Sequence, residues 1–155
     1  MVVDAPFPLP LLVTGIAGVA GYNAFTYFRD LYPGQVIGTR RADNWRLRGT
    51  AIEPCDIHDE RRVDELFERH QFAAVLNCEG TCKLKSCELD PVMARRVNIG
   101  GVTNLLRAIQ GTSVRLVHMS VDLVFSGTRQ GARVEEDEPD PVTVYGATMA
   151  EAEQL

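Results

Sequence analysis

The sequence predicts a doubly wound α/β domain built on a parallel sheet with the strand order 3-2-1-4-5. Three observations predict it: short apolar runs alternate with amphipathic stretches, a glycine-rich turn follows the first apolar run, and 155 residues suffice for one core. Strands separated by helices of this length are joined by right-handed crossovers, which cover both faces of a parallel sheet. We therefore expect one domain over residues 1–155.

The first half of the chain contains four expected strands. Residues 11–13 form an apolar run, and the apolar residues after it recur at helical spacing until Tyr32-Pro33-Gly34 stops the helix. Residues 35–38 and 50–53 are the second and third strands. A charged helix with an apolar face follows over 59–69, and residues 72–76 form a buried fourth strand. Strand and helix thus alternate from the start.

The second half begins with a long expected helix. Asp90 is a helix N-cap followed by proline, and the helix runs to about Gln110 with Gly111 as its C-cap. Gly100 and Gly101 lie inside it, where we expect them to allow a strand or a ligand to approach closely. Residues 114–119 form the fifth strand and 126–141 a polar loop, and a last helix begins near residue 144. That helix has no stop signal, so we expect the polypeptide to continue past residue 155.

Composition excludes several classes of function. The 16 basic residues are outnumbered by 21 acidic ones, so the net charge of −5 gives no reason to bind nucleic acid or an anionic membrane. The apolar stretches are too short to cross a bilayer, and a basic N-terminal region typical of a secretory signal is missing. We therefore expect a cytoplasmic protein with reduced cysteines.

The glycine-rich turn predicts a dinucleotide site. Its glycines recur at spacings of three, directly after a strand and at the start of a helix. The first permits a tight turn, the second lets the backbone approach a pyrophosphate, and the third allows close packing. The alternative is a helix that merely needs close packing. The expected cofactor-binding residues of the turn are Thr14, Gly15, Ile16, Ala17, Gly18 and Gly21.

Two further positions bear on the choice of cofactor. The second strand ends in Arg40 and Arg41, whose planar guanidinium groups suit a 2′-phosphate, and Arg46 and Arg48 enlarge the basic patch. This favours NADP over NAD, although a solvated arginine cluster is the alternative. Asp56-Ile57 follows the third strand and is placed to reach the adenine; a capping or loop aspartate is the alternative.

The ordered motifs of the chain resemble the extended short-chain dehydrogenase/reductase superfamily, in particular its dTDP-4-dehydrorhamnose reductase group. The resemblance covers nearly the whole chain. It implies a Rossmann fold that binds NAD(P), as the N-terminal part of a longer protein, with further cofactor contacts at Asn77, Cys78 and Asn98. The matching segments are Thr14–Gly21, Asp56-Ile57, Asn77, Glu88–Pro91, Val97–Leu105, Val117–Gly127, Pro141 and Tyr145-Gly146.

The resemblance also implies a catalytic site, and here the sequence departs from the pattern. The family uses a hydroxyl residue, a tyrosine that donates a proton to the substrate carbonyl, and a lysine four residues later. Tyr145 matches the tyrosine, but Val121 and Met149 occupy the other two positions. Ser120 lies one residue from the hydroxyl position, and Asp122 is a candidate substrate contact. A structural tyrosine packed beside the cofactor is the alternative role for Tyr145.

We expect positions 121 and 149 to border a polar cleft, where Met149→Lys with Val121→Thr would leave stability nearly unchanged. Cys78, Cys82 and Cys87 lie close together, but their spacing is not that of a zinc knuckle. We therefore predict ordinary thiols and no metal. His118 is expected to be packed rather than catalytic.

The function that follows is an NADP-binding, reductase-like protein with a degenerate catalytic triad, related to enzymes that reduce a nucleotide-activated 4-keto sugar. A non-catalytic NADP-binding subunit that regulates a partner enzyme is the rival, because the resemblance extends to the regulatory subunit of methionine adenosyltransferase. A sugar-nucleotide epimerase or dehydratase is a third reading that needs the same missing lysine. A homodimer is left open.

Overall fold

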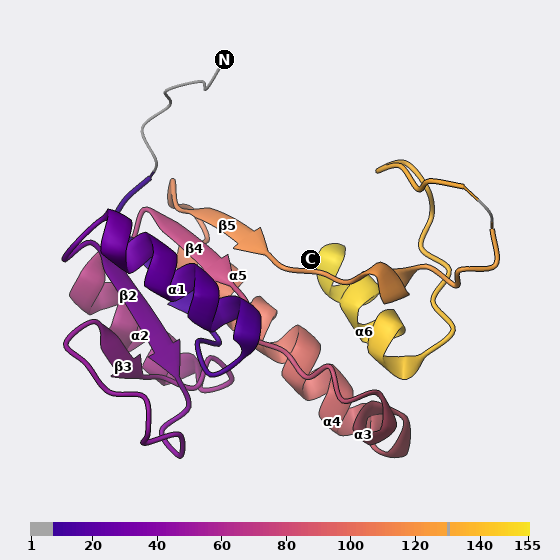
Figure 1. Cartoon of the computed structure of the whole chain (residues 1–155), viewed down its shortest axis with the longest axis horizontal. Helices are drawn as coiled ribbons and strands as arrows, with labels where there is room; N and C mark the ends of the chain where they lie inside the picture. The colour runs from indigo at the N-terminus through magenta and orange to yellow at the C-terminus, as the bar shows by residue number, and fades with distance from the viewer. Residues whose placement is uncertain (1–7, 130) are drawn as a thin grey trace.

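Five parallel strands form the sheet in the computed structural model, which describes residues 8–129 and 131–155 (Figure 1). Their order is β3-β2-β1-β4-β5, so the predicted topology is confirmed. The expected and observed strands overlap but differ by one to two residues at most ends. The strands are β1 Leu11–Thr14, β2 Val36–Arg40, β3 Ile52–Pro54, β4 Ala74–Asn77 and β5 Arg115–His118.

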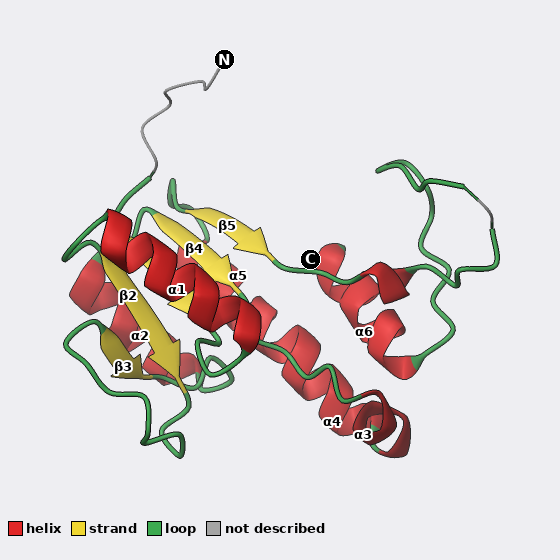
Figure 2. Cartoon of the chain, in the orientation of Figure 1, coloured by secondary structure: helices red, strands yellow, loops and turns green. Residues whose placement is uncertain are grey.

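Helices cover both faces of the sheet because successive strand residues point to opposite sides. Leu11 and Val13 pack in one cluster with Phe25 of α1 (Val19–Leu31). Leu12, between them, packs on the other side with residues of α2 (Glu60–His70) and α5 (Gly101–Ile109). Figure 2 shows α1 on the near face, with α2 and α5 behind the sheet. The core therefore has two layers around a buried central strand.

The expected long helix over 90–110 is divided. Asp90 caps α4 (Pro91–Arg95) by accepting a hydrogen bond from the Met93 amide at 2.9 Å, as predicted. A π-helical turn over Arg96–Gly100 then leads into α5, and a short helix α3 (Leu84–Leu89) precedes Asp90. The π-turn and α3 were not expected. At the far end of α5 the C-cap is Gln110 rather than the predicted Gly111, which comes one residue later with a φ of +74°.

The glycine pair inside this region has two different environments. A Cβ on Gly101 would lie 2.5 Å from the Ile57 side chain, so this glycine allows the segment after β3 to pack closely. The close neighbour is thus a loop side chain rather than a strand or a ligand. Gly100 faces open space, and the expectation of a close approach was wrong there.

The last helix, α6 (Val144–Glu153), is attached to α3 and α4 by polar contacts. Thr143 caps it through a hydrogen bond from the Gly146 amide at 3.0 Å. Glu88 of α3 accepts a hydrogen bond from the Val144 amide, and Arg95 of α4 makes a paired contact with Glu151, both bonds being 2.6 Å long. These contacts place α6 beyond the carboxyl edge of the sheet (Figure 1).

The segment over 126–141 contains neither helix nor strand in its described residues, as predicted. None of the helices in the described ranges has the length and apolar composition needed to span a lipid bilayer.

Candidate cofactor site

A cavity of about 410 Å³ lies at the carboxyl edge of the sheet, where β1, β2 and β4 end. Ligands of open parallel sheets bind at this edge, next to the point where the strand order reverses, which here lies between β1 and β4. Six of the predicted cofactor-binding residues line the cavity. The lining is Gly15, Ala17, Gly18, Arg40, Arg41, Asp43, Asn44, Cys78, Glu79 and Gly80.

The glycine turn has the geometry that the sequence predicts. Gly15 has a φ of +67°, and a Cβ there would lie 2.7 Å from backbone atoms of Cys78 and Glu79. Only glycine meets both demands, since other residues are strained at positive φ. Gly21 is equally restricted, because a Cβ would lie 2.4 Å from the Gly15 carbonyl oxygen. The turn therefore closes tightly against α1 and the loop after β4.

The N-terminus of α1 opens beside this turn. Gly18 precedes the helix, and neither a capping side chain nor an acidic residue occupies its first turn. The first amides of a helix lack intrahelical partners, and they carry the positive end of the helix dipole. Gly18 and Ala17 are exposed, so an anion can approach these amides.

The turn residues Thr14 and Ile16 do not line the cavity. The Thr14 hydroxyl donates a hydrogen bond to the Asn77 side chain at 2.5 Å, and it is fully buried. The Ile16 side chain is in the core beneath α1, and its amide donates to the Thr39 carbonyl oxygen at 3.2 Å. Both residues hold the turn in place.

Arg40 is bound by its own loop. Its guanidinium group donates to the carbonyl oxygen of Leu47 at 2.6 Å and to that of Arg41 at 3.0 Å. These bonds order the loop after β2 and leave only part of the guanidinium for a ligand. Arg46 and Arg48 stack instead on the exposed Trp45 ring, and Arg46 also lines an adjoining hollow with Ala17 and Gly18. Of the predicted basic patch, Arg40 and Arg41 line the cavity itself.

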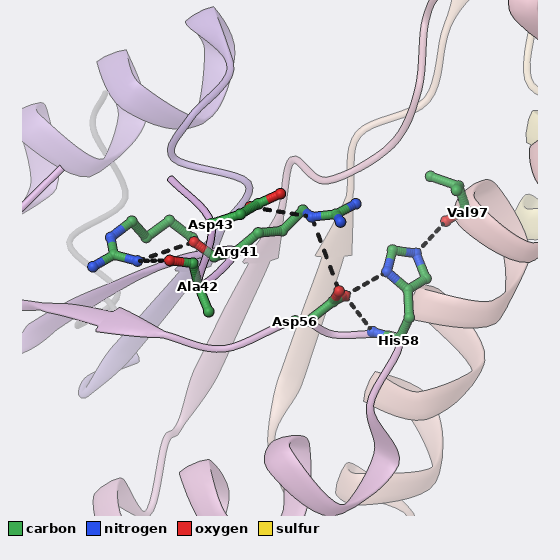
Figure 3. A network of polar contacts seen from close by, with 7 residues as sticks. Arg41, Ala42, Asp43, Asp56, His58 and Val97 are labelled. Carbon is green, nitrogen blue, oxygen red and sulfur yellow. Dashed lines mark hydrogen bonds and ion pairs between the residues drawn. The ribbon is translucent and has the colours of Figure 1, made fainter. Parts of the chain in front are cut away.

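Arg41 belongs to a polar network with the residues after β3 (Figure 3). Its guanidinium lies 3.5 Å from the Asp43 carboxylate and 4.0 Å from that of Asp56. Asp56 also accepts hydrogen bonds from the His58 amide at 3.1 Å and the His58 ring at 2.6 Å. Burial by itself raises the pKa of Asp56, but these bonds outweigh it and the net pKa is lowered. Asp56 is thus a negatively charged loop residue beside the cavity.

His58 spans this network. Its Nδ1 faces Asp56, and its Nε2 lies 3.0 Å from the Val97 carbonyl oxygen in the π-helical turn (Figure 3). Asp56, His58 and Glu79 bring potential ligand atoms within 4.8 Å of one another. Because both ring nitrogens face oxygen acceptors, the imidazole has no free nitrogen for a metal. We interpret Asp56 and His58 as a hydrogen-bonded pair beside Glu79.

Asn77, Asn98 and Ile57 have structural partners rather than a place in the cavity. Asn77 is fully buried and connects Thr14, the Glu79 amide and His118. Asn98 is also buried, and its amide bonds the Thr81 backbone and the Thr148 hydroxyl. Ile57 belongs to the core. These three side chains were expected to contact the cofactor directly, but none of them lines the cavity.

His118, Cys55, Cys78 and Cys87 are buried or half-buried, whereas Cys82 is exposed. Burial lowers the pKa of His118, whose Nδ1 lies 3.0 Å from the Asn77 amide nitrogen. Burial raises the pKa of Cys78 to about 11, and it also raises that of Cys87. All four cysteines are free thiols. A protonated thiol is a poor metal ligand.

Sequence reasoning missed four residues of the cavity: Asp43, Asn44, Glu79 and Gly80. Glu79 and Gly80 directly follow Cys78, and in an open parallel sheet the first residues after β4 lie beside the first turn. Glu79 therefore had a positional signal. Asp43 and Asn44 are in an irregular loop, where the sequence carries no periodicity that would place a side chain.

The region around Tyr145 forms a separate apolar cluster. Met149 and Val124 are buried, and Val121, Phe125 and Tyr145 pack against them. Met149 is only 4% exposed, so the expectation that positions 121 and 149 border a polar cleft was wrong. Burial raises the pKa of Tyr145, and the charge of Asp122 raises it further. Ser120 and Asp122 are exposed beyond the end of β5.

Comparison with known proteins decides the family. The sequence model of the RmlD substrate binding domain family matches residues 10–155. The chain belongs to the RmlD substrate binding domain family. This confirms the resemblance to the dTDP-4-dehydrorhamnose reductase group that the ordered motifs predicted. The strand order of the sheet agrees with this family assignment.

The relatives of this RmlD-family chain include reductases and a subunit of another enzyme. It is 32% identical to a dTDP-4-keto-6-deoxy-D-glucose reductase of Streptomyces niveus over 143 residues, which cover 92% of this chain and 46% of that protein. It is 25% identical to the methionine adenosyltransferase 2 subunit beta of Rattus norvegicus, over 93% of this chain and 41% of that one. The chain thus spans about half the length of the curated relatives it matches.

A solved structure shows the same fold. The dTDP-4-dehydrorhamnose reductase of Bacillus anthracis, described in complex with NADP, superposes with a TM-score of 0.77 at 23% identity. The match covers 97% of this chain and 50% of that chain.

Proposed function

We propose that this chain is the NADP-binding part of a reductase-like protein whose proton-donating site is degenerate. The cavity supports the cofactor assignment, because the amides at the start of α1 suit a pyrophosphate and Arg41 suits a further phosphate. The Bacillus anthracis relative, which carries NADP by its description, supports the same choice. The substrate we propose is a nucleotide-activated 4-keto sugar, from the names of the reductases in the family.

The observation that carries the degenerate site is the apolar packing of Met149 beside Tyr145. A bound nicotinamide cofactor would supply the hydride for reduction of a carbonyl, and the carbonyl oxygen would also have to receive a proton. If Tyr145 donates that proton, it becomes a phenolate. Burial and the charge of Asp122 oppose this anion, and Met149 offers no compensating positive charge. Proton donation from Tyr145 is therefore expected to be slow.

The second candidate is a non-catalytic, NADP-binding regulatory subunit. The same observation favours it, because a position filled by a buried methionine serves packing rather than proton transfer. The Rattus norvegicus relative is named as a subunit of another enzyme, which supports this reading.

Two measurements on the full-length protein test these proposals. Calorimetric titration with NADPH and NADH should show tighter binding of NADPH. Equal affinities, or tighter binding of NADH, would remove the argument from the arginines. A single-turnover assay with NADPH and a dTDP-4-keto sugar should then show a rate far below about 10 per second, a typical median for enzymes. A rate near that median would refute the degenerate site.

A further inference from the structure

Glu79 is a carboxylic acid that the proposed function does not use. It follows Asn77 and Cys78 after β4 and lines the cavity beside the glycine turn. Its backbone amide is bound to the Asn77 side chain at 3.2 Å, which holds the residue in this position. Its Oε2 atom is buried and has no hydrogen-bond partner among the described residues. A buried polar atom without a partner is costly, and the cost is greater for an ionised carboxylate than for a neutral carboxyl group.

The charged neighbours of Glu79 are bound to other groups. His58 faces Asp56 and Val97 with its two ring nitrogens, and Arg41 lies against the carboxylates of Asp43 and Asp56. The glycine turn packed against the Glu79 backbone has no charged side chain from Thr14 to Gly21. Burial and the nearby charge of Glu79 raise the pKa of the Cys55 thiol to about 12, so this thiol also lies close to Glu79. No group of the chain that the structure describes therefore satisfies Oε2.

These surroundings also hold the Glu79 carboxyl close to its titration point at neutral pH. Burial raises its pKa, and the negative charge of Asp56 raises it further; His58 and Arg41 act in the opposite direction. The net result is a pKa of about 7, above the ordinary value of 4.5. The carboxyl is thus largely neutral at pH 6 and largely ionised at pH 8.

One consequence follows for a ligand of the cavity. An ionised carboxylate in the same cavity as Arg40 and Arg41 repels an additional phosphate. Glu79 and the two arginines therefore act in opposite directions on a 2′-phosphate.

We propose that Glu79 is a specificity-determining residue of this cavity, which, when ionised, opposes the 2′-phosphate of the cofactor. This inference rests on the proposed binding of a nicotinamide dinucleotide. It adds that the preference for NADP over NAD declines as the pH rises through neutrality.

The experiment compares the full-length wild type with Glu79→Gln, which keeps the shape of the side chain and removes its charge. Dissociation constants of NADP and NAD are measured by calorimetry at pH 6 and pH 8. At pH 8 the variant should prefer NADP over NAD more strongly than the wild type does, on the order of tenfold. At pH 6 the two proteins should differ much less.

Controls separate this effect from other titrations. The 2′-phosphate itself titrates near pH 6, so the difference between wild type and variant is the measured quantity. Glu136→Gln removes an exposed carboxylate from the polar loop and should leave the preference unchanged. Glu79→Ala, which also removes the charge, should raise the NADP preference at pH 8 as Glu79→Gln does, and it provides a second variant should the first be poorly folded.

The outcomes distinguish the two proposals. If the wild type binds NADP and both Glu79 variants have the same preference for NADP over NAD as the wild type at both pH values, the inference about Glu79 is overturned while the proposed function stands. If the wild type binds neither cofactor, the proposed function fails and the inference fails with it.

Discussion

The side-chain amide of Asn98 donates a hydrogen bond to the Thr148 hydroxyl at 2.9 Å, which connects the π-helical turn to α6. The two residues are 50 positions apart in the sequence. The side-chain carbonyl oxygen of Asn98 also accepts a hydrogen bond from the Thr81 amide at 2.8 Å. One buried side chain thus joins the loop after β4, the π-helical turn and α6. The position of α6, and with it that of Tyr145, depends on this residue.

Asn98→Ala is therefore expected to lower the free energy of unfolding by about 2 kcal/mol, because the part-buried Thr81 amide loses its acceptor and the Thr148 hydroxyl keeps only its bond to the Tyr145 carbonyl oxygen. Chemical denaturation monitored by circular dichroism measures the change. Asn23→Ala, on the exposed face of α1, should change stability by less than about 0.5 kcal/mol. An Asn98→Ala protein as stable as the wild type would contradict this role.

Met149→Lys is expected to destabilise the protein by about 2–4 kcal/mol, because the ammonium group would enter an apolar cluster. Met149→Leu, which conserves size and polarity, should cost less than about 1.5 kcal/mol. Denaturation curves of the two variants give the comparison. If Met149→Lys with Val121→Thr were as stable as the wild type, position 149 would border polar space after all.

Gly15→Ala and Gly34→Ala separate backbone strain from steric exclusion. Both glycines have positive φ, but a Cβ at Gly34 meets nothing within 4 Å, whereas at Gly15 it meets the backbone after β4. We expect Gly34→Ala to cost about 1 kcal/mol and Gly15→Ala clearly more, with loss of cofactor binding only in the latter. Thermal unfolding and calorimetry provide the two readouts. Equal losses would indicate that strain alone matters.

Arg41→Ala is expected to weaken NADP binding about tenfold and to change NAD binding little, because a guanidinium contact to a phosphate is lost. Its stability should be unchanged, since the Arg41 side chain is 58% exposed. Arg40→Ala should in addition lower the melting temperature, because its bonds to loop carbonyls disappear. Arg61→Ala, on the exposed surface of α2, is the matched control. Identical losses for NADP and NAD would contradict a phosphate contact at Arg41.

The stability of the protein should depend on pH because the pKa of Glu79 differs between the folded and unfolded states. Its pKa is about 7 in the folded protein and near 4.5 in the unfolded chain, so between these values the folded state binds more protons. The Glu79 contribution to stability is therefore complete below pH 4.5 and is lost as the pH rises to about 7. Relative to the wild type, Glu79→Gln should become more stable over this range, by up to about 3 kcal/mol. Denaturation of both proteins at pH 5 and pH 8 measures the difference in their unfolding free energies. A difference that does not change with pH would refute the raised pKa of Glu79.

Local patterns in the sequence were sufficient to predict the sheet order, the glycine turn and most of the helices. These features depend on periodicity, turn chemistry and capping within a few residues. Gly15 illustrates the point, because its spacing to Gly18 and its place after an apolar run predict a tight turn that the structure confirms. The alternation of strands and helices then restricts the topology by the handedness of the crossovers.

The tertiary structure decided which side chains face the cavity. Asn77 and Asn98 follow the family pattern, but both are buried in hydrogen bonds to residues far away in the sequence. Met149 packs into an apolar cluster that sequence reasoning placed at a polar cleft. The position of Glu79 after β4 could be read from the sequence, but its raised pKa could not. Its pKa depends on burial and on the charges of Asp56 and His58 after β3 and Arg41 after β2. These segments meet only when the sheet has formed, and no local pattern encodes the distances between them.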